Sequence, residues 1–299
     1  MVVRWYGQWW RRWQDAHSTT RLMIGVWLGA VLYLALAGQA IFGLLLLASS
    51  VLIGILLTLI LTDAPPKVGR VVMGAPYNRI VLQLAVLLGI IALTSLSLSS
   101  YVPLWTEAVN IFRGIGKAYL SPLLIIEPEK TLGDLGAYFF IPLSLLLMLG
   151  ARWREFGIDR LGHRTGQIAL IWCVLPSAFI LLALWARATA PSVVLRSLLT
   201  SALYAFGTEF LFRGALQTRL LRLFSLRWTL LIQALLFALW HAPNLIAQLN
   251  GQALAGIAYA VALYGTLGMA LGVIALRTRS LWAGIAFSAV IGSFNLMSG

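Results

Sequence analysis

The stretch from Leu22 to Thr62 contains no charged residue and is almost entirely apolar. A helix needs about 20 apolar residues to cross the hydrocarbon core of a bilayer, so this stretch is long enough for two crossings. Gly38 to Ala40 separate its two halves, which favours a tightly connected pair of helices over a single one. Because backbone polar groups in lipid must be bonded within the protein, apolar runs of this length are expected to fold as transmembrane helices.

The composition extends this conclusion to the whole chain. Of its 299 residues, 61% are hydrophobic and 10% are charged, whereas an ordinary soluble domain has about 25% charged residues. This excludes a soluble enzyme with one anchor, a secreted disulfide scaffold and a disordered chain. The single cysteine, Cys173, lies in an apolar run and cannot form an internal disulfide.

Hydropathy along the chain predicts an all-α, polytopic integral membrane protein with about eight to nine transmembrane helices. Each expected span is bounded by polar or turn-forming residues. The nine candidate spans are residues 22–38, 40–62, 80–100, 135–151, 167–186, 192–216, 228–243, 253–276 and 281–297.

The distribution of basic residues predicts the orientation of these spans. With the N-terminus in the cytoplasm, sixteen of the Lys and Arg residues fall in cytoplasmic segments and four in external ones. Cytoplasmic loops retain cations, so the asymmetry supports this orientation and an external C-terminus. The net charge of +13 is therefore mainly topological, and we expect no nucleic-acid partner. A bacterial cytoplasmic membrane, or a thylakoid in a photosynthetic source, is the expected location.

Three regions are predicted along the chain. Residues 1–21 carry tryptophans at four-residue spacing among arginines, which is typical of an amphipathic helix in the headgroup region. Residues 22–134 form an N-terminal transmembrane region that ends in a long external segment, 101–134. This segment is either a docking surface or a solvated connector. Residues 135–299 form the third region, and a membrane protein partner is plausible for the first two.

Few ionisable side chains lie inside the predicted spans, and such groups are candidates for function because burying them is costly. They are Arg196, Glu209, Arg213 and His241. Glu209 and Arg213 are spaced i to i+4 with the acid first, which favours an ion pair on one helix face.

His241 is related to Glu209 by the turn near Ser225. Both residues are sixteen positions from this turn, so at 1.5 Å per residue each lies about 24 Å along its helix and both can share one membrane level. An acid and an imidazole at that level could activate a water for hydrolysis. They could equally satisfy each other in a low-dielectric core.

No metal or cofactor site is predicted. Catalytic zinc usually needs three protein ligands, and the other two histidines, His17 and His163, lie in segments predicted to be cytoplasmic. We therefore expect no metal and no cofactor.

Three sequence blocks stand out in the second half, namely TEFLFRG at 208–214, FALWHAPN at 237–244 and RTRSLWA at 277–283. Together they resemble the CPBP family, which contains the type II CAAX proteases and the bacteriocin-processing and self-immunity proteins. They occur in the family's order, and the resemblance covers roughly residues 165–297. It implies an all-helical intramembrane endopeptidase, a hydrolase that acts on membrane-bound peptides.

The resemblance also implies roles for individual residues. In the family, the first Glu of an EExxxR motif and the histidine of FxxxH activate water, and a late His and Asn four residues apart stabilise the oxyanion. Here the second Glu is Glu209, the Arg is Arg213 and the histidine is His241. Thr208 replaces the first Glu, and Ser288 and Gly292 occupy the late His and Asn positions.

These replacements lead to two main hypotheses. A hydroxyl needs a base of its own before it can act as one near neutral pH, and loss of one oxyanion donor typically costs about 100- to 1000-fold in rate. The first hypothesis is therefore a pseudoenzyme that binds another membrane protein as an assembly, retention or immunity factor. The second is an active endopeptidase that uses Glu209 and His241. A transporter is less favoured, because its pathway would need more polar groups at the midplane.

Overall fold

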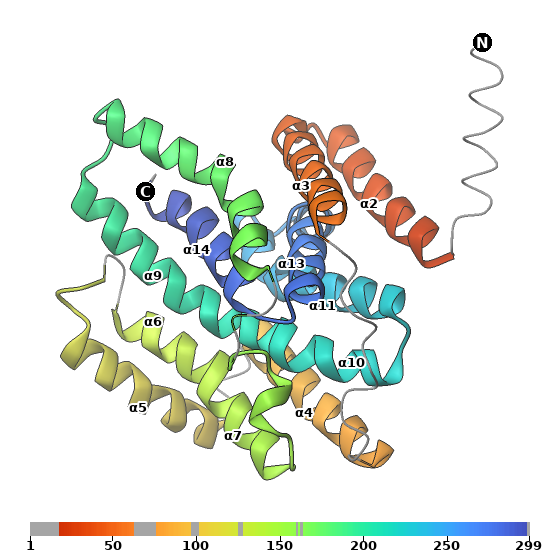
Figure 1. Ribbon diagram of the computed structural model, residues 1–299, viewed down its shortest axis with the longest axis vertical. Helices are drawn as coiled ribbons and strands as arrows, with labels where there is room; N and C mark the ends of the chain where they lie inside the picture. Colours follow the sequence, from red (N-terminus) through yellow and green to blue (C-terminus); the bar gives the residue numbers. More distant parts are fainter. Residues whose placement is uncertain are drawn as a thin grey trace. The chain divides into compact units, whose positions relative to one another are not determined.

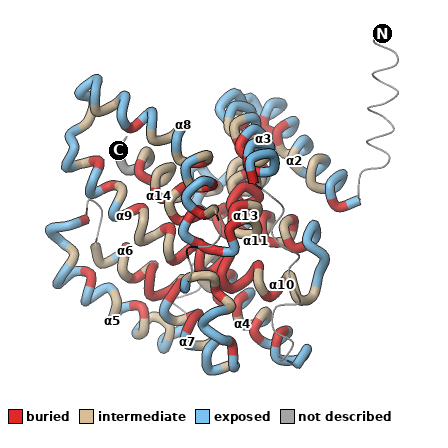
Figure 2. Tube along the Cα trace, in the orientation of Figure 1, coloured by how far each residue is buried: buried red, intermediate tan, exposed pale blue. Residues whose placement is uncertain are grey.

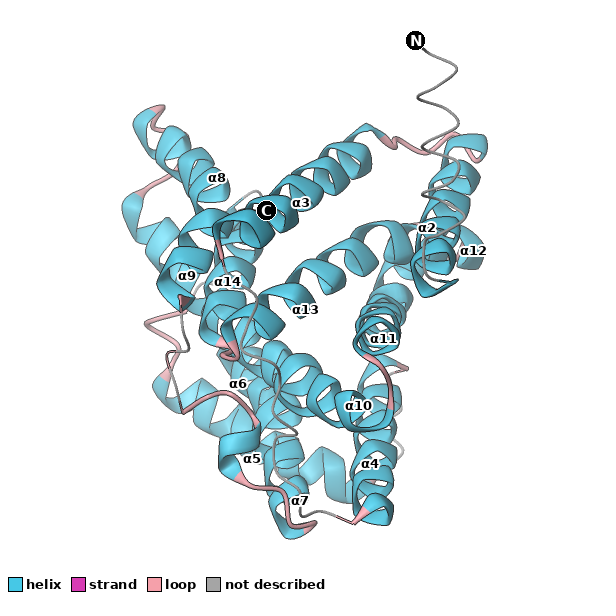
Figure 3. Cartoon of the chain, turned by 45° about the vertical axis from the view of Figure 1, so that its right-hand side comes forward, coloured by secondary structure: helices cyan, strands magenta, loops and turns pink. Residues whose placement is uncertain are grey.

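The computed structural model describes residues 18–62, 76–96, 102–124, 128–159, 161 and 164–297. Within these ranges every regular element is helical (Figure 3), which confirms the all-α class. Seven of the described helices are long and apolar enough to cross a membrane, and α14 is a shorter apolar helix. The chain is therefore a polytopic integral membrane protein. Residues 1–17, which make up most of the predicted interfacial segment, lie outside the described residues.

Figure 1 labels the helices along the chain. Short non-α stretches, written η, interrupt several of them. In order the elements are α2 (Ser18–Leu36), α3 (Phe42–Leu61), α4 (Tyr77–Ser95), α5 (Pro103–Tyr119), α6 (Pro128–Leu135), η2 (Gly136–Phe140), α7 (Ile141–Met148), η3 (Trp153–Glu155), α8 (Thr165–Trp185), α9 (Pro191–Glu209), η4 (Phe210–Gln217), α10 (Thr218–Leu223), α11 (Leu226–Gln248), α12 (Ala253–Ala260), η5 (Val261–Gly265), α13 (Thr266–Thr278) and α14 (Trp282–Met297).

Each of the nine predicted spans contains a helix among its described residues, but two differ from the other seven. The helix α9 is not among the seven apolar spans. Its sequence contains Arg196, Glu209 and several Ser and Thr residues, which lower its mean hydropathy. The helix α14 is apolar but short. These two helices also carry the candidate site described below.

The segment 101–134, which is predicted to be external, contains more regular structure than hydropathy predicts. The helix α5 packs along α6, and α6 continues through η2 into α7, so that the candidate span runs from Pro128 to Met148. Gly116 faces the Pro128 carbonyl at the contact between α5 and α6. The rings of Phe112 and Phe140 stack with centroids 5.1 Å apart. A docking role for this segment stays a prediction.

The described chain divides into two compact units. The larger consists of Val51–Leu223 and the chain from Ala270 onward, and the smaller of the chain up to Ser50 together with Phe224–Met269. Each unit is built from two separate segments of the chain, so the units do not correspond to the three regions inferred from sequence. The three-region division stays a prediction.

Small residues bring the helices of the larger unit into close contact. The helix α14 packs against α9 and α8, and Gly292 lies so close to Ser201 that a Cβ atom there would be 3.2 Å from the serine Oγ. Such approaches are the main source of helix association in lipid, where apolar area alone provides no driving force. In Figure 2 buried residues follow α14 and the second half of α9, whereas α8 is mostly exposed. Exposed apolar helices such as α8 are the surface that a bilayer covers.

Polar side chains connect the helices of the smaller unit. The Trp27 indole of α2 donates a hydrogen bond to the Thr266 hydroxyl at 2.9 Å. The Gln233 amide of α11 donates to the Gly268 carbonyl at 2.7 Å. Gly268 is needed there, because a Cβ atom would lie 3.0 Å from the Ala234 Cα. These bonds tie α2, α11 and the chain around η5 together.

Three π-helical stretches interrupt the spans, namely η2, η4 and η5. In a π-helical turn the backbone hydrogen bonds join residues i and i+5 in place of i and i+4. Such turns occur frequently at functional sites. Arg213 lies within η4, and Tyr264 lies within η5. Arg213 contacts Glu209, and Tyr264 contacts His241.

Candidate functional site

A buried ion pair between Glu209 and Arg213 forms the centre of the site. Glu209 is the last residue of α9 and Arg213 follows in η4. The Arg213 Nη1 lies 3.2 Å from the Glu209 Oε1, and the residues are 2% and 1% exposed. The i to i+4 spacing therefore produces the contact that the sequence predicts. Two charges removed from water to this extent depend on each other, because either one alone would be buried without compensation.

The helix α14 supplies the other contacts of the carboxylate. The Ser288 hydroxyl donates a hydrogen bond to the Glu209 Oε1 at 3.3 Å. A Cβ atom at Gly284 would lie 2.8 Å from the Glu209 Oε2, so the glycine makes room for the carboxylate. This Oε2 is buried and has no hydrogen-bond partner among the described residues. One carboxylate oxygen thus has an ion-pair partner in Arg213 and a hydrogen-bond donor in Ser288, while the other faces the backbone of α14.

Thr208 lies next to the ion pair but directs its hydroxyl elsewhere. The hydroxyl donates to the carbonyl oxygens of Tyr204 at 3.1 Å and Ala205 at 3.2 Å, both in the preceding turn of α9. Back-bonding of this kind satisfies a Thr side chain inside a helix without a further partner. The position at which the family resemblance expects a carboxylate is therefore occupied by a hydroxyl bonded to its own helix.

The late pair of positions, Ser288 and Gly292, lies on the side of α14 that packs against α9. Ser288 contacts Glu209, and Gly292 faces Ser201. A larger side chain at 292 would require Ser201 to move. Both positions predicted from the resemblance are therefore part of the α9–α14 contact. Ser288 contributes a hydroxyl to this contact, and Gly292 has no side chain.

His241 belongs to the smaller unit and lies in an aromatic environment. Its ring stacks on that of Tyr264 with centroids 3.7 Å apart and an interplanar angle of 9°. The rings of Phe237 and Trp240 approach it edge-on, at 4.9 Å and 4.7 Å. Glu209 and His241 fall in different units, so the predicted pairing of the two stays a prediction. Arg196, the remaining ionisable residue of the predicted spans, is exposed on α9.

A second buried arginine was not predicted from sequence. The Arg219 Nε donates to the Gln83 Oε1 at 3.1 Å, and its Nη2 lies 3.2 Å from the Glu155 Oε2. Arg222 binds the other oxygen of Glu155, also at 3.2 Å. The Arg219 guanidinium lies over the Phe156 ring at 4.6 Å.

The sequence predicts the basic residues near this segment only as charges of a cytoplasmic loop. Burial lowers the pKa of Arg219 to about 10, although the charge of Glu155 acts in the opposite direction. Gln83 and Glu155 lie far from Arg219 in the chain, so no local spacing pattern could have revealed the cluster.

The structure thus defines a polytopic helical membrane protein with a buried acid–arginine site between α9, η4 and α14. Residues 187–294 match the model of a known family, described as type II CAAX prenyl endopeptidase Rce1-like. This match includes the ion pair, His241 and Ser288, and it confirms the predicted resemblance of this part of the chain to the CPBP and CAAX protease family. No curated protein and no solved structure matches the chain.

Proposed function

We propose that this protein is a CAAX-protease-like membrane protein that no longer hydrolyses peptides and instead binds another membrane protein. In this role it acts as an assembly, retention or immunity factor. The observation that carries the proposal is the state of the acid site. Thr208 donates its hydroxyl to backbone carbonyls, and Glu209 is held by Arg213 and Ser288.

Hydrolysis needs a base that can take a proton from water and donors that stabilise the developing oxyanion. Glu209 is the carboxylate that remains, and its Oε1 is ion-paired with Arg213 and accepts a hydrogen bond from Ser288. The late positions provide a hydroxyl that already binds this carboxylate and a glycine. These features favour binding over catalysis.

One observation favours the second candidate, an active endopeptidase that uses Glu209 and His241. The Glu209 Oε2 has no hydrogen-bond partner among the described residues. An oxygen of this kind is the atom at which a water would be activated. The two candidates therefore differ in whether Oε2 meets a reacting water.

We propose the bacterial cytoplasmic membrane as the location, or the thylakoid in a photosynthetic source, with the N-terminus in the cytoplasm and the C-terminus outside. The sixteen-to-four distribution of basic residues supports this orientation. Fusion of a reporter that is active only in the cytoplasm to either end of the chain would test it. Activity is expected at the N-terminal fusion alone.

The first experiment compares cells that express tagged wild-type protein with cells that express His241→Ala. The protein is purified in mild detergent, copurifying proteins are identified by mass spectrometry, and protein termini in the membrane fraction are mapped. A stoichiometric membrane protein retained by both forms, with unchanged termini, is expected. A terminus present in wild-type cells and lost in the His241→Ala cells would identify an active protease and overturn the proposal.

A second experiment restores the missing carboxylate. Thr208→Glu is compared with Thr208→Val, which has the shape of threonine but no hydroxyl. Under the proposal, wild type and Thr208→Val both lack peptidase activity against prenylated peptides in detergent. Measurable hydrolysis by wild type would contradict the proposal. Hydrolysis by Thr208→Glu alone would support it, because it would show that loss of this one group stopped the chemistry.

A further inference from the structure

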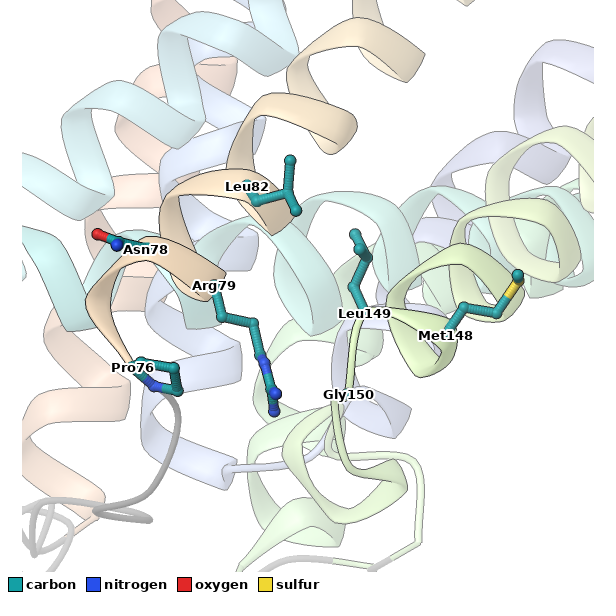
Figure 4. Close-up of a pocket in the computed structure, with 7 residues that line it drawn as sticks. All are labelled: Pro76, Asn78, Arg79, Leu82, Met148, Leu149 and Gly150. Atoms are coloured by element: carbon teal, nitrogen blue, oxygen red, sulfur yellow. The ribbon is translucent and has the colours of Figure 1, made fainter.

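A pocket lies between the first turn of α4 and the end of α7, away from the acid site. Its volume is about 470 Å³. Figure 4 shows Leu82 and Leu149 on its opposite sides and the Arg79 side chain extending between the two helices. The lining residues are Pro76, Asn78, Arg79, Leu82, Met148, Leu149 and Gly150.

The position of the pocket along the helices sets its depth in the membrane. It lies at the start of the candidate span Tyr77–Ser95 and at the end of the candidate span Pro128–Met148. The ends of two neighbouring spans lie at the boundary between hydrocarbon and headgroups. The pocket therefore opens at the level where phospholipid phosphates are found, and the distribution of basic residues predicts that this is the cytoplasmic face.

The pocket contains one cation, the exposed side chain of Arg79, and among the described residues its guanidinium has no hydrogen-bond or ion-pair partner. Its guanidinium extends toward Gly150, as Figure 4 shows. A Cβ atom at Gly150 would lie 2.6 Å from the Arg79 Nη1. The glycine, which has a φ of +79°, therefore leaves the space that the guanidinium uses.

The remaining walls are apolar. Leu82 and Leu149 flank the arginine, and Met148 is 84% exposed. A guanidinium binds a phosphate through two parallel hydrogen bonds, and basic pockets between transmembrane helices are typical sites for anionic headgroups. An acyl chain of the same molecule could lie against Leu82 and Met148. A phosphate group attached to a lipid thus matches both the charge and the apolar walls.

We propose that this pocket binds the phosphate of an anionic phospholipid through Arg79, with the acyl chain along Leu82 and Met148. The site is independent of the proposed loss of hydrolysis. The competing explanation is that Arg79 only stabilises the end of α7, where the amide of Gly150 bonds to the Leu147 carbonyl at 2.8 Å. A cation near the C-terminal end of a helix is favourable without any ligand.

Thermal unfolding in detergent separates these explanations. Purified full-length protein is measured with added phosphatidylglycerol, phosphatidylcholine or inorganic phosphate. Phosphatidylglycerol is expected to raise the Tm by about 3 °C more than phosphatidylcholine. Inorganic phosphate is expected to have little effect, because it cannot use the apolar walls.

Variants assign the effect to the pocket. Arg79→Gln is expected to remove the preference for phosphatidylglycerol, whereas Arg79→Lys retains part of it. Arg187→Gln serves as the matched control, because Arg187 is also exposed at the end of a span but does not line the pocket. Leu82→Ala keeps the charge and should weaken the stabilisation by phosphatidylglycerol, which covers the case in which Arg79→Gln fails to fold.

Three results would overturn the proposal. Arg79→Gln could retain the full preference, which would move the lipid site elsewhere. Arg79→Gln could lower the Tm equally in both lipids while the preference persists, which would leave Arg79 as a helix-end cation. Inorganic phosphate could reproduce the whole stabilisation, which would identify a soluble phosphate ligand instead of a lipid.

Discussion

Two buried arginine–carboxylate groups lie in the larger unit, and they differ in how completely they are satisfied. Around Arg219, each of the three guanidinium nitrogens has a partner, and both oxygens of Glu155 are bound. Around Arg213, one oxygen of Glu209 is bound and the other has no partner among the described residues. A satisfied buried network rigidifies a fold, whereas an unsatisfied polar atom costs stability and usually has a functional reason. The comparison identifies the first group as structural and the second as the functional candidate.

The largest expected effect is that of Arg213→Met. It would leave the Glu209 carboxylate buried with Ser288 as its remaining hydrogen-bond donor in the described site. Loss of one partner of a buried pair costs about 3–5 kcal/mol. Unfolding of the purified protein in detergent would measure it, with Arg196→Met as the control, since Arg196 is exposed on the same helix. Equal stability of the two variants would show that the ion pair contributes nothing.

A smaller loss is expected for Arg219→Met. Arg222 still binds one oxygen of Glu155 in this variant, so the acid keeps a partner and the cost is about 2–3 kcal/mol. The same unfolding measurement applies, and the double variant Arg219→Met, Arg222→Met should lose more than the sum of the single changes. Additive losses would mean that the three residues do not act as a network.

Gly284→Ala tests the space beside the unpartnered oxygen. The new methyl group would lie 2.8 Å from the Glu209 Oε2, so the carboxylate has to move at a cost of about 1–2 kcal/mol. Gly166→Ala is the matched control, because a Cβ atom there has nothing within 4 Å, and alanine in a helix is slightly favourable. Comparable Tm values for the two variants would argue against close packing at Gly284.

The smallest effect is expected for Thr208→Val. The change removes a hydroxyl that bonds only to carbonyl oxygens of its own helix among its described contacts, so the free energy of unfolding should change by less than about 1 kcal/mol. Circular dichroism during heating would measure it. A loss as large as that of Arg213→Met would mean that Thr208 supports the ion pair directly.

Much of the fold could be predicted because lipid restricts the backbone so strongly. The run from Leu22 to Thr62 indicated two helices, and the structure has α2 and α3 there. The segment 101–134 was predicted less well, because hydropathy does not detect an amphipathic helix such as α5. Hydropathy also predicts that the next span starts at residue 135, whereas the helix begins at Pro128.

The candidate site was predicted only where its residues are neighbours in the chain. The contact between Glu209 and Arg213 follows from helical spacing. The assignment of Thr208, Ser288 and Gly292 came from the family resemblance. Neither the helical spacing nor the family resemblance indicates that Gly284 makes room for the carboxylate or that Arg219 is buried against Gln83.

The sequence by itself determined that this is a helical membrane protein and that an acid and an arginine share one face of α9 and η4. Both depend on local rules, namely hydrogen bonding within a span and the helical repeat. Only the tertiary structure decided that Ser288 and Gly284 meet Glu209. The physical reason is that the approach of α14 to α9 depends on how small residues pack along the whole length of both helices, and no short stretch of sequence contains that information.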